Sequence, residues 1–443
     1  MLAIAGGIIW HHSVHTIRNQ RPLAGPNIDV SPDLQPQTEA SFSIDPRNPK
    51  VLYGATNDAS RETLRVHTST NGGTSWPGTD APVVTGGACA HGNPLTAIDR
   101  TGRQYLAFLA GTFCGDTLTP YLVVTSRDST AGAWAPLVRV VPSAWKFGFD
   151  DWPALALDEQ TGRLYLVWTR SLSAVKVALV LSSSTDHGRT WTAPREVSAA
   201  LAHPHLSTIS VAPDGDVYVG GVDAKLGVWV ARSTDHGATF GAPQRAAPLL
   251  ANPAAQCALT GGDSPIATEE STCFGPNPTV LAGRKQVLVV YGDAGSNRTL
   301  DVYAAVLDRD LKPLARVEVN PPDASATQQL FPAAALDPVT GIAWACWFDT
   351  TFDPHAHRAW FTCSASRTGR TWSPPLAASS APTAPPDLFG AAAKLGVTPS
   401  VVARAGVAHA FWPDGRIIDN SFDIFTVAIP QERALRAAET TYH

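Results

Sequence analysis

The sequence contains few residues of several common types. Among 443 residues there is one methionine, Met1, together with seven lysines and six cysteines, and 16% of the residues are charged. Basic residues form no cluster and the formal net charge is -5. Binding to the phosphates of a nucleic acid requires a basic face, which this sequence lacks. We therefore expect no nucleic-acid partner.

Long apolar runs are also missing. The run from Leu2 to Trp10 has nine residues, whereas a membrane-spanning helix needs about 20. We expect no stable membrane span. No Lys or Arg precedes this run, so it is interpreted either as the remnant of an export segment or as a frayed tail.

Helix breakers are abundant, with 35 glycines and 36 prolines. Long helices tolerate few of either residue, so an all-helical protein is disfavoured. The hydrophobic content of 44% is too high for a disordered chain. These numbers favour a β-rich globular protein.

A short pattern recurs in which Ser, then Asp or Asn, then Gly, then Ser or Thr precede an aromatic residue. Clear copies span residues 69–76, 184–191 and 233–240, and weaker copies end at Trp134 and Trp372. The first two side chains can hydrogen-bond turn backbone, glycine accepts a positive φ, and the aromatic ring can fold back between strands. The pattern predicts a tight turn between two antiparallel strands.

A second unit, two short apolar strands joined by a turn, precedes each aromatic turn. Seven copies have their first strands at residues 40–45, 95–99, 153–158, 207–212, 278–281, 332–337 and 399–403. Each copy, joined to the strands around the aromatic turn, predicts four antiparallel strands. A spacing of roughly 55 to 70 residues is typical of propeller blades rather than solenoid repeats. We predict an all-β, seven-bladed β-propeller, with six blades as the alternative.

The two ends of the chain are expected to close this ring. The last copy has a strand at Asp423–Ile429 but no outer strand after it, and Asn27–Ser31 resembles the segment Arg195–Ser198 that precedes a later blade. Residues 27–31 are therefore predicted to complete the seventh blade, which removes an exposed strand edge. The predicted organisation is a tail at 1–26, one propeller domain at 27–430 and a second tail at 431–443.

The six cysteines fall into three sequence-local pairs. The pairs are Cys89/Cys114, Cys257/Cys273 and Cys346/Cys363. Such pairing favours three disulfides and an oxidising compartment, and the alternative is six buried free thiols.

The aromatic turns resemble the Asp boxes, or BNR repeats, of the sialidase (neuraminidase) superfamily, and the resemblance covers nearly the whole chain. It implies a β-propeller, usually extracytoplasmic, that often acts on or binds glycans. It also implies that the boxes lie on the face away from the active site, so that His187 and His236 are exposed turn residues. Sialidases usually have six blades and carry an Arg-Ile-Pro string; the comparable string here is Arg21-Pro22-Leu23.

The functional mouth is expected on the opposite face, among the loops after each second strand and the crossovers between blades. Glycoside hydrolysis needs a proton donor and a nucleophile or base, normally two carboxyls, or a tyrosine with its base in sialidases. The catalytic candidates at the mouth are Glu39, Asp150, Asp151 and Tyr291. The substrate-binding candidates are Arg61, Arg170, Arg298 and Arg358, which can grip a carboxylate, and Trp152.

Metal binding is not expected. Two His-x-His pairs, His203/His205 and His355/His357, lie in blades far apart around the ring, and no Cys/His spacing typical of zinc is present. We predict neither a metal nor another cofactor.

Two functions fit these features. The first is a secreted, sialidase-like exo-glycoside hydrolase; the second is a non-catalytic propeller of the cell envelope that binds glycan or protein. A polysaccharide lyase or a two-domain xyloglucanase-like enzyme fits less well, because the chain predicts one ring. The expected partner is a glycan or glycoconjugate, and the expected state is an extracytoplasmic monomer.

Overall fold

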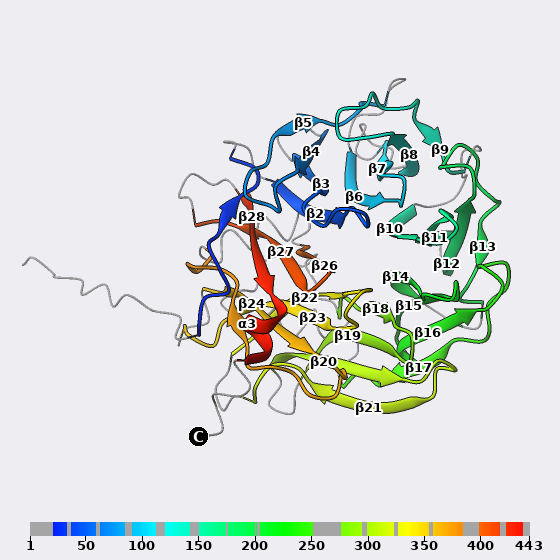
Figure 1. Cartoon of the computed structure of the whole chain (residues 1–443). Coiled ribbons are helices and arrows are strands. Elements are labelled where there is room, and N and C mark those ends of the chain that lie inside the picture. The colour runs from blue at the N-terminus through cyan, green and yellow to red at the C-terminus, as the bar shows by residue number, and fades with distance from the viewer. Residues whose placement is uncertain are drawn as a thin grey trace, which may run out of the picture.

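Seven antiparallel sheets of four strands each are arranged in a ring around a central axis (Figure 1). This computed structural model confirms the predicted all-β, seven-bladed propeller. It describes residues 21–32, 37–58, 63–84, 91–111, 120–141, 150–173, 176–199, 201, 204–250, 276–294, 299–322, 327–353, 358–383, 398–416 and 422–436.

The blades follow one another in chain order, and in each blade the first strand lies nearest the axis. Blades 1 and 2 contain β2 (Gln37–Ile44), β3 (Leu52–Asp58), β4 (Thr63–Ser69), β5 (Gly78–Asp80), β6 (His91–Ile98), β7 (Gln104–Ala110), β8 (Tyr121–Arg127) and β9 (Val138–Arg139). Blades 3 and 4 contain β10 (Asp150–Leu157), β11 (Leu164–Ser173), β12 (Lys176–Ser184), β13 (Arg195–Glu196), β14 (His205–Val211), β15 (Val217–Asp223), β16 (Gly227–Ser233) and β17 (Gln244–Ala247).

Blades 5 to 7 continue the ring. Blades 5 and 6 contain β18 (Thr279–Ala282), β19 (Val287–Ala294), β20 (Leu300–Leu307), β21 (Pro313–Glu318), β22 (Gln329–Leu336), β23 (Ala343–Asp349), β24 (Trp360–Ser366) and β25 (Leu376–Ala377). Blade 7 contains β26 (Ser400–Arg404), β27 (Val407–Asp414), β28 (Asp423–Pro430) and, as its outer strand, β1 (Ile28–Asp29). The short helix α3 (Gln431–Arg436) follows β28.

The N-terminal segment closes the ring as the sequence predicted. Ile28 pairs with Thr426 and Asp29 with Phe425 on β28. The segment just before β1 also adds to blade 6, because the Ala24 amide donates to the Ala377 carbonyl at 2.8 Å. One stretch of chain therefore covers the outer edges of two neighbouring blades.

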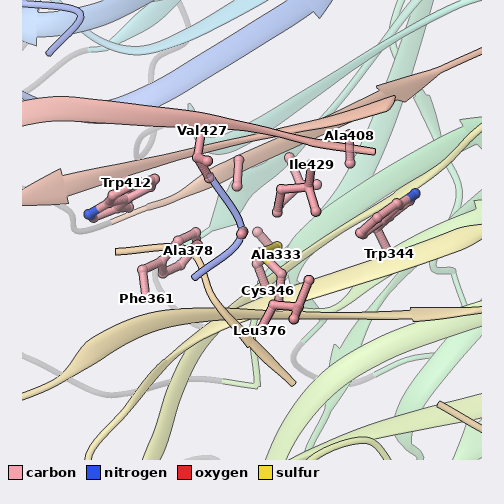
Figure 2. Close-up of a cluster of buried hydrophobic side chains, with 14 of the residues drawn as sticks. Ala333, Trp344, Cys346, Phe361, Leu376, Ala378, Ala408, Trp412, Val427 and Ile429 are labelled. Atoms are coloured by element: carbon pink, nitrogen blue, oxygen red, sulfur yellow. A yellow bond between two sulfur atoms is a disulfide. The ribbon is translucent and has the colours of Figure 1, made fainter. Parts of the chain in front are cut away.

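The hydrophobic core lies between blades rather than within them. Figure 2 shows Trp344 and Cys346 of blade 6 packed with Trp412 and Val427 of blade 7. Cys346 is disulfide-bonded to Cys363, its direct neighbour on β24. This confirms one predicted pair, and the other four cysteines lie outside the described residues.

The aromatic turns lie at the end of the ring where first strands finish, which we call the turn face. In the copy at 184–191, Ser184 Oγ accepts from the Gly188 amide at 2.9 Å, and Asp186 Oδ1 accepts from the Thr190 amide at 2.9 Å. Gly188 has a φ of 82°, and Trp191 Nε1 donates to its carbonyl at 3.1 Å. The predicted turn geometry is confirmed in this copy.

An ion pair joins two blades that are not neighbours. Arg404 ends β26 in blade 7, and Glu159 follows β10 in blade 3. Arg404 Nη1 lies 2.8 Å from Glu159 Oε1. Because blades 1 and 2 separate them along one side of the ring and blades 4 to 6 along the other, the pair spans the central channel at the turn face.

Candidate active site

At the opposite end of the channel, which we call the mouth face, the first strands enter the ring through irregular backbone. Six non-glycine residues here have a left-handed conformation with φ between 39° and 56°: Glu39, Asn93, Trp152, Leu206, Asn277 and Phe331. We call this set the collar. Five of them lie within register shifts between the first and second strands of their blades, and Asn277 lies just before β18.

Proline follows four collar residues, at Pro94, Pro153, Pro278 and Pro332. Proline cannot donate a ladder hydrogen bond and is therefore confined to edges and bulges of a sheet. Left-handed backbone in residues other than glycine costs free energy, and such strain collects at functional sites. The collar residues thus repeat the same local backbone strain around the mouth-face end of the channel.

Glu39 is the collar residue of blade 1, and its carboxylate is held by two donors. Oε2 accepts from the Asn93 amide at 2.6 Å and from Asn57 Nδ2 at 2.5 Å. The pKa of Glu39 is raised to about 7, mainly by burial and to a smaller extent by the nearby charge of Asp151, although the two hydrogen bonds oppose the increase. A carboxyl with this pKa can hold and release a proton near neutral pH.

Asp151 of blade 3 is the carboxyl that acts on Glu39. Its own pKa is raised by burial, which is partly offset by the Trp152 amide donating to Oδ1 at 2.7 Å. The charge of Asp151 favours the protonated form of Glu39, so Glu39 is the better acid of the two and Asp151 the better base.

A cavity of about 180 Å³ opens at the mouth face, along the starts of the first strands of blades 3 to 7. Its lining residues are Trp152, Leu206, Ser207, Asn277, Pro278, Thr279, Pro332, Ala333, Thr398 and Pro399. Trp152 is 41% exposed, and Ser207 Oγ donates a hydrogen bond to its carbonyl. The cavity therefore has an aromatic wall at the edge nearest Asp151, and amide and hydroxyl groups elsewhere.

Asp150 and Arg170 contact each other. They are direct partners on β10 and β11, and both side chains are buried. Arg170 Nε and Nη2 each lie 2.7 Å from one Asp150 oxygen, a bidentate pair. Neighbouring residues of a strand point to opposite faces, so Asp150 meets Arg170 whereas Asp151 acts on Glu39.

Tyr291 lies in the packing between blades 4 and 5, fully buried on β19. Its hydroxyl accepts from Arg316 Nε at 2.8 Å, and burial raises its pKa above the usual range for tyrosine. Arg316 also pairs with Asp293 at 2.9 Å. Tyr291 is not among the residues that line the cavity.

Of the remaining predicted residues, the structure describes Arg358. Arg358 is exposed, just before β24 of blade 6. Arg21 lies beside blade 6, with Nη1 2.5 Å from Asp349 Oδ2. Arg61 and Arg298 lie outside the described residues, as do His203, His355 and His357.

Sequence reasoning missed most of the cavity wall. Leu206, Ser207, Pro278, Thr279 and Pro332 were not candidates, because apolar and small residues carry no chemical signal by themselves. A signal was nevertheless present in the Xaa-Pro pairs that recur where first strands begin, at residues 93–94, 152–153, 277–278, 331–332 and 398–399.

Within the described part of the chain, no helix is long and apolar enough to cross a membrane. Nor does that part contain a group of three or more His, Cys, Asp or Glu side chains arranged to hold a metal ion.

Comparison with known proteins adds information on the fold. No protein-family model matches the chain, and no curated protein does either. An α-L-arabinofuranosidase of Fusarium graminearum in complex with an iminosugar inhibitor has a TM-score of 0.52 at 10% identity, over 93% of this chain and 99% of that one. The GH93 α-L-arabinofuranosidase of the same fungus with arabinobiose has a TM-score of 0.50 at 11% identity, over 94% and 98%.

A Hadza microbial sialidase, Hz136, matches with a TM-score of 0.46 and 13% identity, over 87% of this chain and 74% of that one. At these identities the likeness concerns architecture alone. The likeness to the two arabinofuranosidase structures agrees with the β-propeller fold described above.

Proposed function

We propose that this protein is a glycoside hydrolase of the sialidase-like propeller type, with its reaction centre at the mouth face. The observation that carries the proposal is a buried carboxyl with a raised pKa, Glu39, which senses the charge of Asp151 at the mouth face. Trp152, the residue after Asp151, is exposed in a cavity wall. Glycoside hydrolysis uses two carboxyls of different proton affinity on either side of the scissile bond.

Glu39 is the better general acid. Its pKa of about 7 keeps a large share of it protonated at neutral pH, and the two donors on Oε2 leave Oε1 to face a leaving group. Asp151 then acts as the nucleophile or as the base that activates water. Asn57 and the Asn93 amide position Glu39, and the buried Arg170 fixes Asp150 and thereby the start of β10.

A sialidase-type reaction with Tyr291 as the nucleophile is the other mechanism suggested by the sequence. A phenol that is fully buried and whose pKa is raised is hard to ionise and hard for a sugar to reach. The carboxyl pair therefore carries the proposal. Propellers with this fold include α-L-arabinofuranosidases, but a shared fold does not assign a reaction.

The proposal includes export. The disulfide between Cys346 and Cys363 is the kind of bond that persists in oxidising compartments. We propose a secreted or envelope location for the protein, and a monomeric state.

The test is a panel of fluorogenic glycosides, sialosides included, assayed with the wild type, Glu39→Gln and Asp151→Asn. We expect turnover of at least one glycoside and a loss of about 100-fold or more in each variant. Asp186→Asn, on the turn face, is the matched control and should keep wild-type turnover. Equal turnover in all four proteins would refute the assignment of the pair.

A glycan-binding propeller without catalysis is the second candidate, favoured by the exposure of Trp152 in the cavity wall. Aromatic walls with a few amides and hydroxyls suffice to bind sugars. Binding on a glycan array without turnover of any glycoside would support this candidate over the first.

A further inference from the structure

We propose that the mouth selects an uncharged sugar, which stacks on Trp152, and discriminates against sugars that carry a carboxylate. This inference names the substrate class of the site and rests on the proposed glycan-binding function. It follows from the charges around the cavity, from the pairing of Arg170 and from the chemistry of the wall.

Among the described residues, the ten that line the cavity include no Lys, Arg or His. Asp151 directly precedes Trp152 of this wall in the chain, and its charge acts on Glu39. A sugar carboxylate placed beside two carboxyls meets like charge in a partly desolvated site, which is strongly unfavourable. A neutral sugar meets no such repulsion.

Arg170, the arginine opposite the start of β10, is already paired with a carboxylate. Arg170 holds Asp150 with two bonds of 2.7 Å, and the two side chains are 4% and 5% exposed. Gripping a substrate carboxylate would require Arg170 to leave a buried, bidentate partner. Arg316 and Arg416, on the same face of blades 5 and 7, likewise pair with the buried Asp293 and Asp414.

The wall suits the apolar face of a sugar ring. Trp152 presents an exposed aromatic side chain, and Leu206, Pro278, Pro332 and Pro399 continue the apolar surface. Asn277, Thr279, Thr398 and Ser207 add amide and hydroxyl groups, which pair with sugar hydroxyls without requiring a charge. A volume of about 180 Å³ is below the range of pockets that hold drug-sized ligands, which suits a single sugar ring.

Left-handed backbone supports this assignment independently. Trp152, Leu206 and Asn277 belong to both the collar and the cavity lining. Trp and Leu rarely adopt this conformation by local preference, so the surrounding structure must hold them in it. We attribute this to the placement of their side chains in the cavity wall.

The experiment compares pairs of aryl glycosides that differ in one group, a hexoside against the matching hexuronide, with a pentoside and a sialoside added. Calorimetry with the free sugars measures binding separately from turnover. We expect the neutral member of a pair to have a kcat/KM, or an affinity, about 100-fold higher than the acidic member.

Two variants sharpen the comparison. Trp152→Ala should weaken binding of the neutral sugar about tenfold or more, whereas Val339→Ala, another exposed apolar residue (63%) that lies on the turn face, should not. Thr398→Arg adds a cation to the wall and should reduce the preference for the neutral sugar. A melting temperature for each variant separates these effects from misfolding.

The outcomes distinguish this inference from the proposed function. Turnover with a preference for the uronide or sialoside would overturn the inference and leave the hydrolase standing. Binding of neutral sugars without turnover would support the inference and count against hydrolysis. Absence of both binding and turnover for every sugar would overturn both.

Discussion

The two ends of the central channel are built on different principles. On the turn face, polar side chains satisfy the backbone: in the turn at 233–240, Ser233 Oγ accepts from the Gly237 amide at 2.8 Å and Asp235 Oδ1 from the Thr239 amide at 2.8 Å. On the mouth face, six collar residues hold left-handed backbone and two carboxyls have raised pKa values. Left-handed non-glycine residues also occur in the turns, at His187 and His236, so the contrast between the two faces lies in the buried carboxyls of the mouth face and not in backbone strain alone.

The largest contrast should appear when one tryptophan from each face is truncated. Trp76, on the turn face, is 8% exposed and donates to the Gly73 carbonyl at 2.9 Å, whereas Trp152 is 41% exposed. Trp76→Ala should lower the free energy of unfolding by about 3–5 kcal/mol, and Trp152→Ala by less than about 1 kcal/mol. Urea unfolding measures both, and equal losses would break the contrast between the faces.

A second contrast concerns pH. The pKa of Glu39 rises from 4.5 to about 7 on folding. Between these values the folded chain keeps a proton that the unfolded chain has lost, so stability falls as pH rises. Above pH 7 the cost reaches up to about 3 kcal/mol. Glu39→Gln should therefore gain stability over the wild type progressively from pH 4.5 to pH 8.

Asp186 on the turn face should show the opposite sign, because hydrogen bonds from Thr190 and Ser184 outweigh burial and lower its pKa to about 2. Its stabilisation is complete above pH 3.8 and is lost as pH falls through about 2. Asp186→Asn should be destabilised at pH 7 and match the wild type in strong acid. Parallel pH profiles for the two variants would contradict the comparison.

The smallest contrast tests backbone strain. Trp152 and His236 have φ values of 49° and 57°, which glycine adopts more easily. Trp152→Gly and His236→Gly should each raise the free energy of unfolding by roughly 0.5 kcal/mol, since relief of strain exceeds the added entropy of the unfolded chain. Only Trp152→Gly should reduce sugar binding. A loss of binding in His236→Gly would show that the two ends communicate.

The fold was predictable because each blade repeats the same local signals. Ser184, Asp186, Gly188 and Trp191 specify one turn through contacts among themselves, so the spacing along the chain suffices to predict it. The closing strand was predictable for a related reason: a seventh blade that lacks an outer edge requires a partner, and Asn27–Ser31 has the matching pattern.

The site was less predictable, because it depends on which face of a strand each side chain occupies. Asp150 and Asp151 are adjacent in sequence, yet one pairs with Arg170 and the other acts on Glu39. Alternation along β10 sets this division, because Asp150 pairs with Arg170 and Asp151 with Thr169 before the register shifts. Strand register cannot be read from composition. The burial of Tyr291 is likewise a property of blade packing, which its loop-proximal position did not reveal.

The contact between Arg404 and Glu159 has a consequence for how the ring comes apart. Blades otherwise contact mainly their sequence neighbours, and arrays of that kind can open at any one joint. The ion pair joins blade 7 to blade 3 across the channel. Separating blade 7 from blade 1 therefore also has to break this ion pair. The ring is thus held closed in two places, by the ion pair across its central channel and by the pairing of β1 with β28 at its outer edge.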